Sequence, residues 1–235
     1  MNKFSDCNEC GVRNKTNFNH LHSNFLNELS CHKQAVFFKK GESVFQRGDD
    51  VKGFFCINQG SIRTFIVSSL GKEQSFNICY PGDWVGYRDT IIGDIYNHSA
   101  VCLEDVYACF VSKSKVEEFI QRDSDFQHEI LKDMAKNWRD SENQAYSLGT
   151  KQIHSKLAEL LIAFYNSSEI SPEIELKITR EVMASMIGTT TESVIRALSD
   201  FKVRNWISLE KNKIVIQDYN AIFAMSEIYK HELRY

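Results

Sequence analysis

An acidic and a basic side chain one helical turn apart stand out in the last third of the chain. Glu192 and Arg196 are four residues apart, and in a helix this spacing places both side chains on one face. An arginine can bond O6 and N7 of guanine together, and a glutamate can accept from the amino group of cytosine. The same spacing is typical of a solvated salt bridge. The residues around the pair therefore decide between the two interpretations.

Those surrounding residues have the layout of a helix-turn-helix. Thr179 is placed to cap a first helix, Gly188 to end it with a positive φ, and a threonine to cap the second helix. Val194, Leu198 and Phe201 follow at i, i+4 and i+7, which predicts that they are buried and that the opposite face meets a DNA groove. The predicted DNA-binding residues are Thr189, Thr190, Thr191, Glu192, Ile195, Arg196, Arg180, Lys211 and Lys213.

Cysteine is the second residue type that could do chemistry. The chain has seven cysteines, and a reducing compartment favours metal binding or redox sensing over a disulfide framework. Cys7 and Cys10 form a C-x-x-C pair, and soft thiolates of this kind hold iron–sulfur clusters. Cysteine is also a small hydrophobe that cores accept. A core position is favoured for Cys56, Cys79 and Cys102, which alternate on expected strands. For Cys31 a core position and a functional role are given equal weight.

The composition limits what kind of protein this is. Its 235 residues are 43% hydrophobic and 25% charged, which is typical of one large or two small globular domains and excludes a disordered or collagen-like chain. The longest apolar runs are far shorter than the about 20 residues of a membrane span, and the first residues carry no secretory signal. We expect a cytoplasmic protein without a membrane partner. The net charge of −3 gives no sign of nucleic acid, so DNA binding has to rest on local charge.

The positioning elements follow from glycine spacing and hydrophobic period. Most glycines fall between residues 41 and 93, separated by short runs rich in valine, isoleucine and phenylalanine, which predicts a β-sandwich, roll or barrel. From about Lys113 the period becomes helical, and a thin apolar stripe over 125–148 predicts a dimer coil, or packing against the β unit, or both. The predicted dimer interface is Ile130, Met134, Asn137, Trp138, Ser141, Ala145 and Leu148. Beyond Lys151 we expect a helix over 153–166, a strand over 174–178 and a hairpin over 206–217.

Three phrases of the β region carry a family resemblance. The phrases are the segments 40–49, 58–62 and 81–86, and a long helix and a winged helix-turn-helix follow them. In this order the parts resemble the Crp/Fnr family of bacterial transcription regulators. The resemblance covers the chain from about Leu21 onward. The resemblance implies an α+β fold: an N-terminal double-stranded β-helix (a jelly roll like that of cyclic-nucleotide-binding domains), a long dimerisation helix and a C-terminal winged helix-turn-helix. The implied parts are an arm over 1–20, a β-roll sensor over 21–112, a linker and dimerisation helix over 113–150, and a DNA-binding domain over 151–235.

The resemblance also implies a function. Family members bind two-fold symmetric double-stranded DNA as homodimers, so Glu192 and Arg196 would read the G·C pairs of a TTGA- or TGTGA-like half-site. RNA polymerase would be a further partner of an activator. No phosphate loop, nucleophile elbow or His-Glu-x-x-His motif is present, so we expect no enzyme. No cyclic nucleotide is expected, because Tyr87 replaces the ribose-binding glutamate and no arginine lies between Arg88 and Arg122 to hold the phosphate.

The Fnr branch, whose members carry an oxygen-labile iron–sulfur cluster, is the most similar. Cys109 falls where that branch keeps a cluster-binding cysteine, and Cys7 and Cys10 match two of its three N-terminal cysteines. The third is missing, so Cys31, His20 or His22 would have to complete a four-ligand site. The resemblance thus favours an iron–sulfur cluster. The alternatives are a disulfide switch between Cys109 and Cys7 or Cys10, a haem or small-ligand sensor, and a constitutive DNA-binding protein.

Overall fold

The structure is a computed structural model that describes residues 6–16, 21–167, 173–175, 178–210 and 213–228. Contacts divide the chain into an N-terminal unit over 1–139 and a C-terminal unit over 140–235. The division falls inside one helix, α4 (Ser124–Thr150), because its first half packs on the β-strands and its second half on the helix that follows. Among the described helices, none combines the length and the hydropathy that crossing a bilayer requires.

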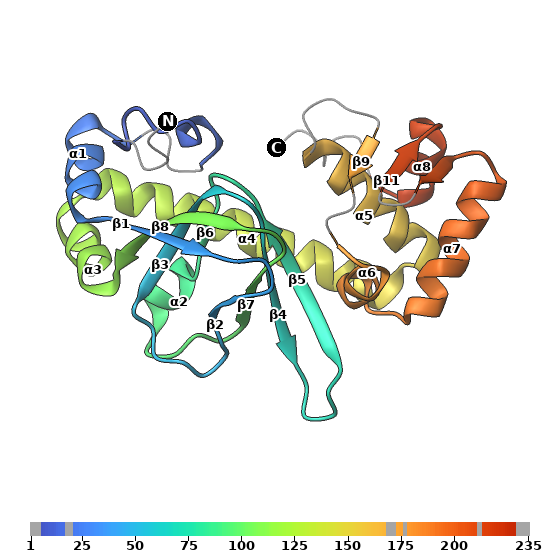
Figure 1. The fold of residues 1–235 in the computed structure, drawn as a ribbon, viewed down its shortest axis with the longest axis horizontal. Coiled ribbons are helices and arrows are strands. Elements are labelled where there is room, and N and C mark those ends of the chain that lie inside the picture. Colours follow the sequence, from blue (N-terminus) through green and yellow to red (C-terminus); the bar gives the residue numbers. More distant parts are fainter. Residues whose placement is uncertain (1–5, 17–20, 168–172, 176–177, 211–212, 229–235) are drawn as a thin grey trace. The chain divides into compact units, whose positions relative to one another are not determined.

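The N-terminal unit is built on two antiparallel sheets of four strands each (Figure 1). Their strand orders are β1-β8-β3-β6 and β2-β7-β4-β5. The strands are β1 (Gln34–Phe38), β2 (Ser43–Phe45), β3 (Gly53–Gln59), β4 (Ile62–Val67), β5 (Glu73–Cys79), β6 (Trp84–Val85), β7 (Ser99–Cys102) and β8 (Val106–Ser112). One apolar core, which includes Ile57, Ile62, Val106 and Ala108, fills the interior of this roll. The predicted β-roll is confirmed.

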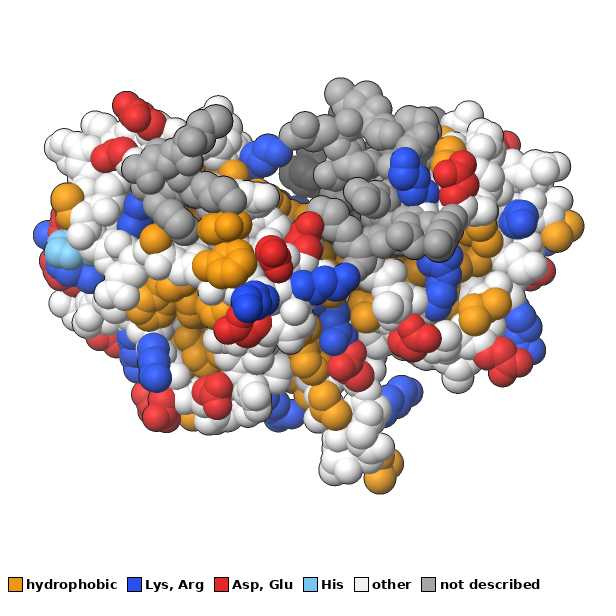
Figure 2. Space-filling view, viewed as in Figure 1, with side chains coloured by type: hydrophobic (Ala, Val, Ile, Leu, Met, Phe, Trp, Pro, Cys, Tyr) orange, Lys and Arg blue, Asp and Glu red, His pale blue; other side chains and the backbone are white. Residues whose placement is uncertain are grey.

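Turn chemistry explains the hairpin that projects from this unit. Strands β4 and β5 pair in register from Ile62 opposite Cys79 to Val67 opposite Glu73. Gly71, in the connection between the two strands, has a φ of +76°, a conformation that costs glycine little. Leu70 beside it is 93% exposed, and hydrophobic side chains are visible on the projecting hairpin in Figure 2.

Helices cover the outer face of the β1-β8-β3-β6 sheet. They are α1 (Ser23–His32), α2 (Tyr87–Ile92), α3 (Lys113–Arg122) and the start of α4, while the short η1 (Arg13–Lys15) precedes them and buries no side chain. A second apolar core joins them to the sheet, and in it the ring of Phe25 lies 4.6 Å from that of Phe119 and 4.9 Å from that of Phe126. The roll therefore has apolar side chains on both faces of one sheet.

The first half of α4 corrects part of the predicted dimer stripe. Phe126 and Ile130 are buried in the second core, and Met134 packs against it. Placing Ile130 in a dimer interface was wrong, because its side chain is already covered within its own unit. Apolar residues four apart are compatible with packing on the β unit and with a dimer coil. In this structure Phe126 and Ile130 pack on the β unit. Trp138, Ser141 and Ala145 remain exposed, and Leu148 is half-buried.

The C-terminal unit has a helical core and a small sheet. Its elements are α5 (Ile153–Ser167), β9 (Glu173–Glu175), α6 (Arg180–Ile187), α7 (Thr191–Val203), β10 (Ile207–Glu210), β11 (Lys213–Ile216) and α8 (Tyr219–Ser226). The antiparallel sheet has the order β10-β11-β9 and forms the wing, which contacts α7 through β10 and α5 through β9 (Figure 1). The helix expected over 153–166 and the hairpin expected over 206–217 are confirmed, with the turn at 211–212 outside the described residues.

Candidate nucleic-acid interface and thiol site

Local caps fix the turn between α6 and α7. The hydroxyl of Thr179 accepts from the backbone N–H of Val182 at 3.3 Å, and that of Thr190 accepts from Ser193 at 3.2 Å. Between them Gly188 ends α6 in the left-handed region with a φ of 67°. The three signals expected from the sequence are present, and together they set the start and direction of α7.

The two faces of α7 differ in burial and in chemistry. Val194, Leu198 and Phe201 are buried, whereas the side chains of Glu192 and Arg196 are 77% and 68% exposed. Nη2 of Arg196 lies 3.5 Å from Oε1 of Glu192. An exposed ion pair of that length contributes little stability, so either group can exchange it for a base edge at small cost.

The remaining predicted DNA contacts are distributed around this face. Ile195 is 53% exposed, while the hydroxyl of Thr190 is occupied as the helix cap. Arg180 is half-buried, its Nη1 lies 3.7 Å from Sδ of Met183, and burial lowers its pKa. Thr189, Thr191 and Lys213 are partly buried, and Lys211 lies outside the described residues.

The second candidate site gathers thiols from distant parts of the N-terminal unit. Cys109 is buried on β8. Nζ of Lys33 donates to Sγ of Cys7 at 3.4 Å, and Nδ2 of Asn58 donates to Sγ of Cys10 at 3.8 Å. The Asn58 side chain is also one of the groups that lower the pKa of Cys109. The structure thus brings Cys7, Cys10 and Cys109 together around Lys33 and Asn58, an arrangement we call the thiol site.

Charge and burial act in opposite directions at the thiol site. Burial raises the pKa of Cys109, and the positive charge of Lys33 is the largest influence that lowers it. Burial on its own lowers the pKa of Lys33, but the negative charges of Cys109, Cys7 and Cys10 raise it overall. Lys33 therefore provides the positive charge that thiolates at this position need.

The remaining cysteines are placed differently. Cys79 and Cys102 are buried in the interior of the roll, as expected. Cys31 is exposed on α1, and His22, another predicted candidate for a fourth ligand, lies 2.7 Å from Asp125 through its Nε2. His20 lies outside the described residues. Cys56 does not join the interior of the roll but packs against the outer core beside Cys7.

Sequence reasoning missed three members of this neighbourhood: Lys33, Asn58 and Cys56. Lys33 directly precedes β1 and had no recognisable pattern. Residues of a strand alternate between its two faces, so Cys56 and Asn58 lie on the same face of β3 as Phe54 of the outer core. Ile57 lies on the other face and fills the interior of the roll. This alternation could have been read from the sequence, and it would have predicted a thiol and an amide on the outer face of the sheet.

The donors of the thiol site are of the kind that iron–sulfur clusters take. Among the residues that the structure describes, no group of three histidine, cysteine or carboxylate side chains is placed to hold one metal ion. In a four-iron cluster the ligands are separate thiolates around a larger group. The thiol site offers soft donors, a nearby cation and an amide donor, which fit such a cluster in kind.

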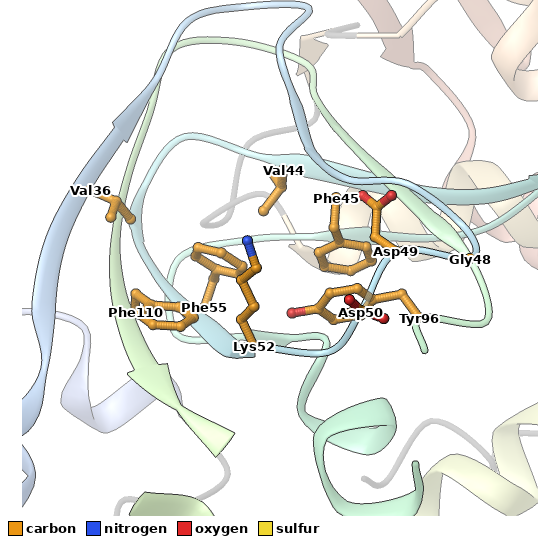
Figure 3. Close-up of a pocket in the computed structure, with 10 residues that line it drawn as sticks. All are labelled: Val36, Val44, Phe45, Gly48, Asp49, Asp50, Lys52, Phe55, Tyr96 and Phe110. Atoms are coloured by element: carbon orange, nitrogen blue, oxygen red, sulfur yellow. The ribbon is translucent and has the colours of Figure 1, made fainter. Parts of the chain in front are cut away.

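The roll also has a hollow of about 750 Å³. It is lined by Val36, Val44, Phe45, Gly48, Asp49, Asp50, Lys52, Phe55, Tyr96 and Phe110. Figure 3 shows Lys52 reaching into the hollow near Phe55, with the ring of Tyr96 stacked on that of Phe45 at 3.8 Å. A phosphate here would meet one amine and two carboxylates, which is a poor anion site. That no cyclic nucleotide binds stays a prediction.

Comparisons with known proteins agree with this architecture. Residues 35–123 match the cyclic nucleotide-binding domain family and residues 155–224 the Crp-like helix-turn-helix domain family. The chain is 24% identical over 200 residues to the transcriptional activator protein anr of Pseudomonas aeruginosa, covering 83% of this chain and 81% of that protein. It is 23% identical over 209 residues to the fumarate and nitrate reduction regulatory protein of Vibrio cholerae, covering 87% and 82%.

Solved structures show the same fold. FixK2 from Bradyrhizobium japonicum superposes with a TM-score of 0.78 at 19% identity, over 84% of this chain and 98% of that chain. A putative crp/fnr-family regulator from Eubacterium rectale gives 0.71 at 20% identity, over 90% and 97%. Two domain families in this order, on this fold and with these relatives, identify a regulator rather than an enzyme. The chain belongs to the Crp/Fnr family of transcription regulators and lies near its Fnr branch.

Proposed function

We propose that this regulator binds two-fold symmetric DNA as a homodimer and that an iron–sulfur cluster at the thiol site controls this binding. The observation that carries the sensing part is the meeting of Cys7, Cys10 and Cys109 around Lys33 and Asn58. A cluster held there supplies a redox-active centre that responds to oxygen or reductant. Cys7, Cys10 and Cys109 would hold it, Lys33 would offset thiolate charge, and Asn58 would donate a hydrogen bond to sulfur.

The DNA-reading part rests on the exposed face of α7. Glu192 and Arg196 protrude together while the opposite face is buried, as a recognition helix in a major groove requires. Arg196 would bond a guanine and Glu192 a cytosine of a TTGA- or TGTGA-like half-site. Thr189, Thr191, Ile195, Arg180, Lys211 and Lys213 would contribute at the edges of the interface.

The dimer would form along α4. Leu131 and Trp138, 65% and 72% exposed, are seven residues apart, and Ala145 continues the series. Met134, Ser141 and Leu148 fall between them, so that the two sets make the a and d positions of a heptad seam. The seam contains few large apolar side chains, so association is weak enough for the sensor to shift it. The sensor would shift the balance between monomer and dimer. In the dimer, the packing of the two α4 helices would set the distance between the two recognition helices.

Anaerobic purification tests the proposal. We expect the wild-type protein and a Cys31→Ser control to be coloured and to contain iron and acid-labile sulfide, and Cys7→Ser and Cys109→Ser to lose most of both. Operator affinity, measured by fluorescence anisotropy, is expected to fall when air is admitted to the wild type. Affinity that ignores oxygen, reductant and chelator would show a constitutive DNA-binding protein.

A disulfide switch is the second candidate, favoured by one contact. Asn58 donates to Sγ of Cys10 and also lowers the pKa of Cys109, so both thiols lie near the same amide. Colourless, iron-free protein whose DNA affinity still follows the oxidant, with a Cys10–Cys109 disulfide found by peptide mass spectrometry, would select this candidate over the cluster.

A further inference from the structure

Cys56 lies on the same sheet face as Cys109 and directly beside it. The two are Cα partners in the antiparallel pairing of β3 with β8. The row continues to Ala35 on β1, which faces Cys109, and to Trp84 on β6, which faces Cys56. Directly opposed residues of antiparallel strands have their Cβ atoms about 4.5–5.5 Å apart on one face. Cys56 and Cys109 are therefore adjacent thiols on the sheet surface beneath the N-terminal arm.

The arm brings the other two thiols to this row. The backbone N–H of Cys7 donates to Oγ of Ser30 on α1 at 2.7 Å, and Cys7 and Cys56 pack against the same outer core. Burial raises the pKa of Cys56, and the charges of Cys109, Cys10 and Cys7 raise it further, in that order. Of the predicted ligands, Cys7, Cys10 and Cys109 therefore lie near enough to Cys56 to act on its charge, whereas Cys31 does not.

The other candidates for a fourth ligand are less well placed. Cys31 is exposed on α1, and His22 is exposed and paired with Asp125. Cys79 and Cys102 lie in the interior of the roll. Among the described residues, Cys56 is the cysteine that joins the thiol site.

We propose that Cys56 supplies the fourth thiolate of the cluster, completing the set of Cys7, Cys10 and Cys109. The inference rests on the proposed function and adds a ligand that the family resemblance does not provide. The four thiols would have to lose their protons to solvent in order to hold the cluster as thiolates. Cys56 thereby takes the place of the N-terminal cysteine that this chain lacks, and it does so from the sheet rather than from the arm.

The test uses the full-length chain, purified anaerobically after reconstitution with ferrous iron and sulfide. Cys56→Ser and Cys56→Ala are compared with Cys102→Ser, which alters a buried cysteine of the roll interior. Cys56→Ala is included because alanine disturbs a packed position less than a hydroxyl does. Cooperative thermal melting selects the variants that fold.

We expect the wild type and Cys102→Ser to bind equal amounts of iron and sulfide. The Cys56 variants should lose at least half of both, with an altered absorption spectrum and an altered electron paramagnetic resonance signal in the reduced state. A folded Cys56 variant with unchanged iron, sulfide and spectra would overturn the inference and leave the proposed function standing. Iron-free wild-type protein would instead overturn the proposed function and this inference with it.

Discussion

The guanidinium of Arg196 is exposed and bound only loosely to Glu192, so its loss should change sequence preference more than folding. We expect Arg196→Ala to weaken operator binding by about 1–3 kcal/mol, the contribution of one bidentate base contact. The measurement is anisotropy on the operator and on a duplex with the half-site guanine replaced. Lys202→Ala, at an exposed position of the same helix, is the charge control, and it should affect both duplexes equally. Equal losses for Arg196→Ala would contradict base reading.

Tyr87 holds a buried carboxylate on α4. Its hydroxyl donates to Oδ2 of Asp133, and Nδ2 of Asn137 donates to the same oxygen at 2.8 Å. Burial raises the pKa of Tyr87, and Asp133 raises it further. We expect Tyr87→Phe to lower the free energy of unfolding by about 1–3 kcal/mol, since a buried acceptor loses a donor. Urea unfolding measures it, with the exposed Tyr146→Phe as a control that should remain within about 0.5 kcal/mol of the wild type.

Asp83 gives the protein a pH dependence of known sign. Burial raises its pKa, although the backbone N–H of Tyr80 donates to its Oδ2 at 2.7 Å. A carboxyl whose folded pKa exceeds its unfolded pKa favours folding when protonated, so that contribution is lost as pH rises through the folded pKa. Asp83→Asn should therefore gain stability relative to the wild type between pH 4 and pH 7. Asp140→Asn, at an exposed position, should show no such trend in melting temperature.

At the scale of elements, two glycines give opposite expectations. Gly188 ends α6 with a φ of 67°, where a Cβ is strained, so Gly188→Ala should cost about 1 kcal/mol or more and misdirect α7. Gly149 lies in α4 with nothing within 4 Å of an added Cβ, so Gly149→Ala should be neutral or stabilise by up to about 1 kcal/mol. Thermal melting of both variants checks the pair. A Gly188→Ala protein as stable as Gly149→Ala would show that the turn is not fixed by this glycine.

The elements that could be predicted from the sequence are those specified locally. The caps at Thr179 and Thr190 and the stop at Gly188 each depend on a few neighbouring residues, and all three are present. The burial of Ile130 could not be decided, because its stripe fits either partner of α4. Cys56 was missed because its proximity to Cys109 follows from the pairing of β3 with β8, and one sequence does not reveal register between distant strands.

For the whole molecule, the state of association should depend on the exposed ring of Trp138. We expect Trp138→Glu to raise the dimer dissociation constant at least tenfold, because the charge would be buried at an a position of the seam. Sedimentation velocity across a concentration series measures the constant. Asn143→Glu, an exposed change on the opposite side of α4, is the matched control. If both variants associate like the wild type, the dimer uses another surface.

Cys31 has a practical consequence for every experiment done in air. Its thiol is exposed on α1, apart from the thiol site, so two molecules can be cross-linked through it when oxygen or peroxide is present. On a non-reducing gel such a species has the mass of a dimer, yet it reports neither the α4 seam nor the sensor. A Cys31→Ser background removes this artefact and leaves any remaining covalent change to the cysteines of the thiol site and the roll.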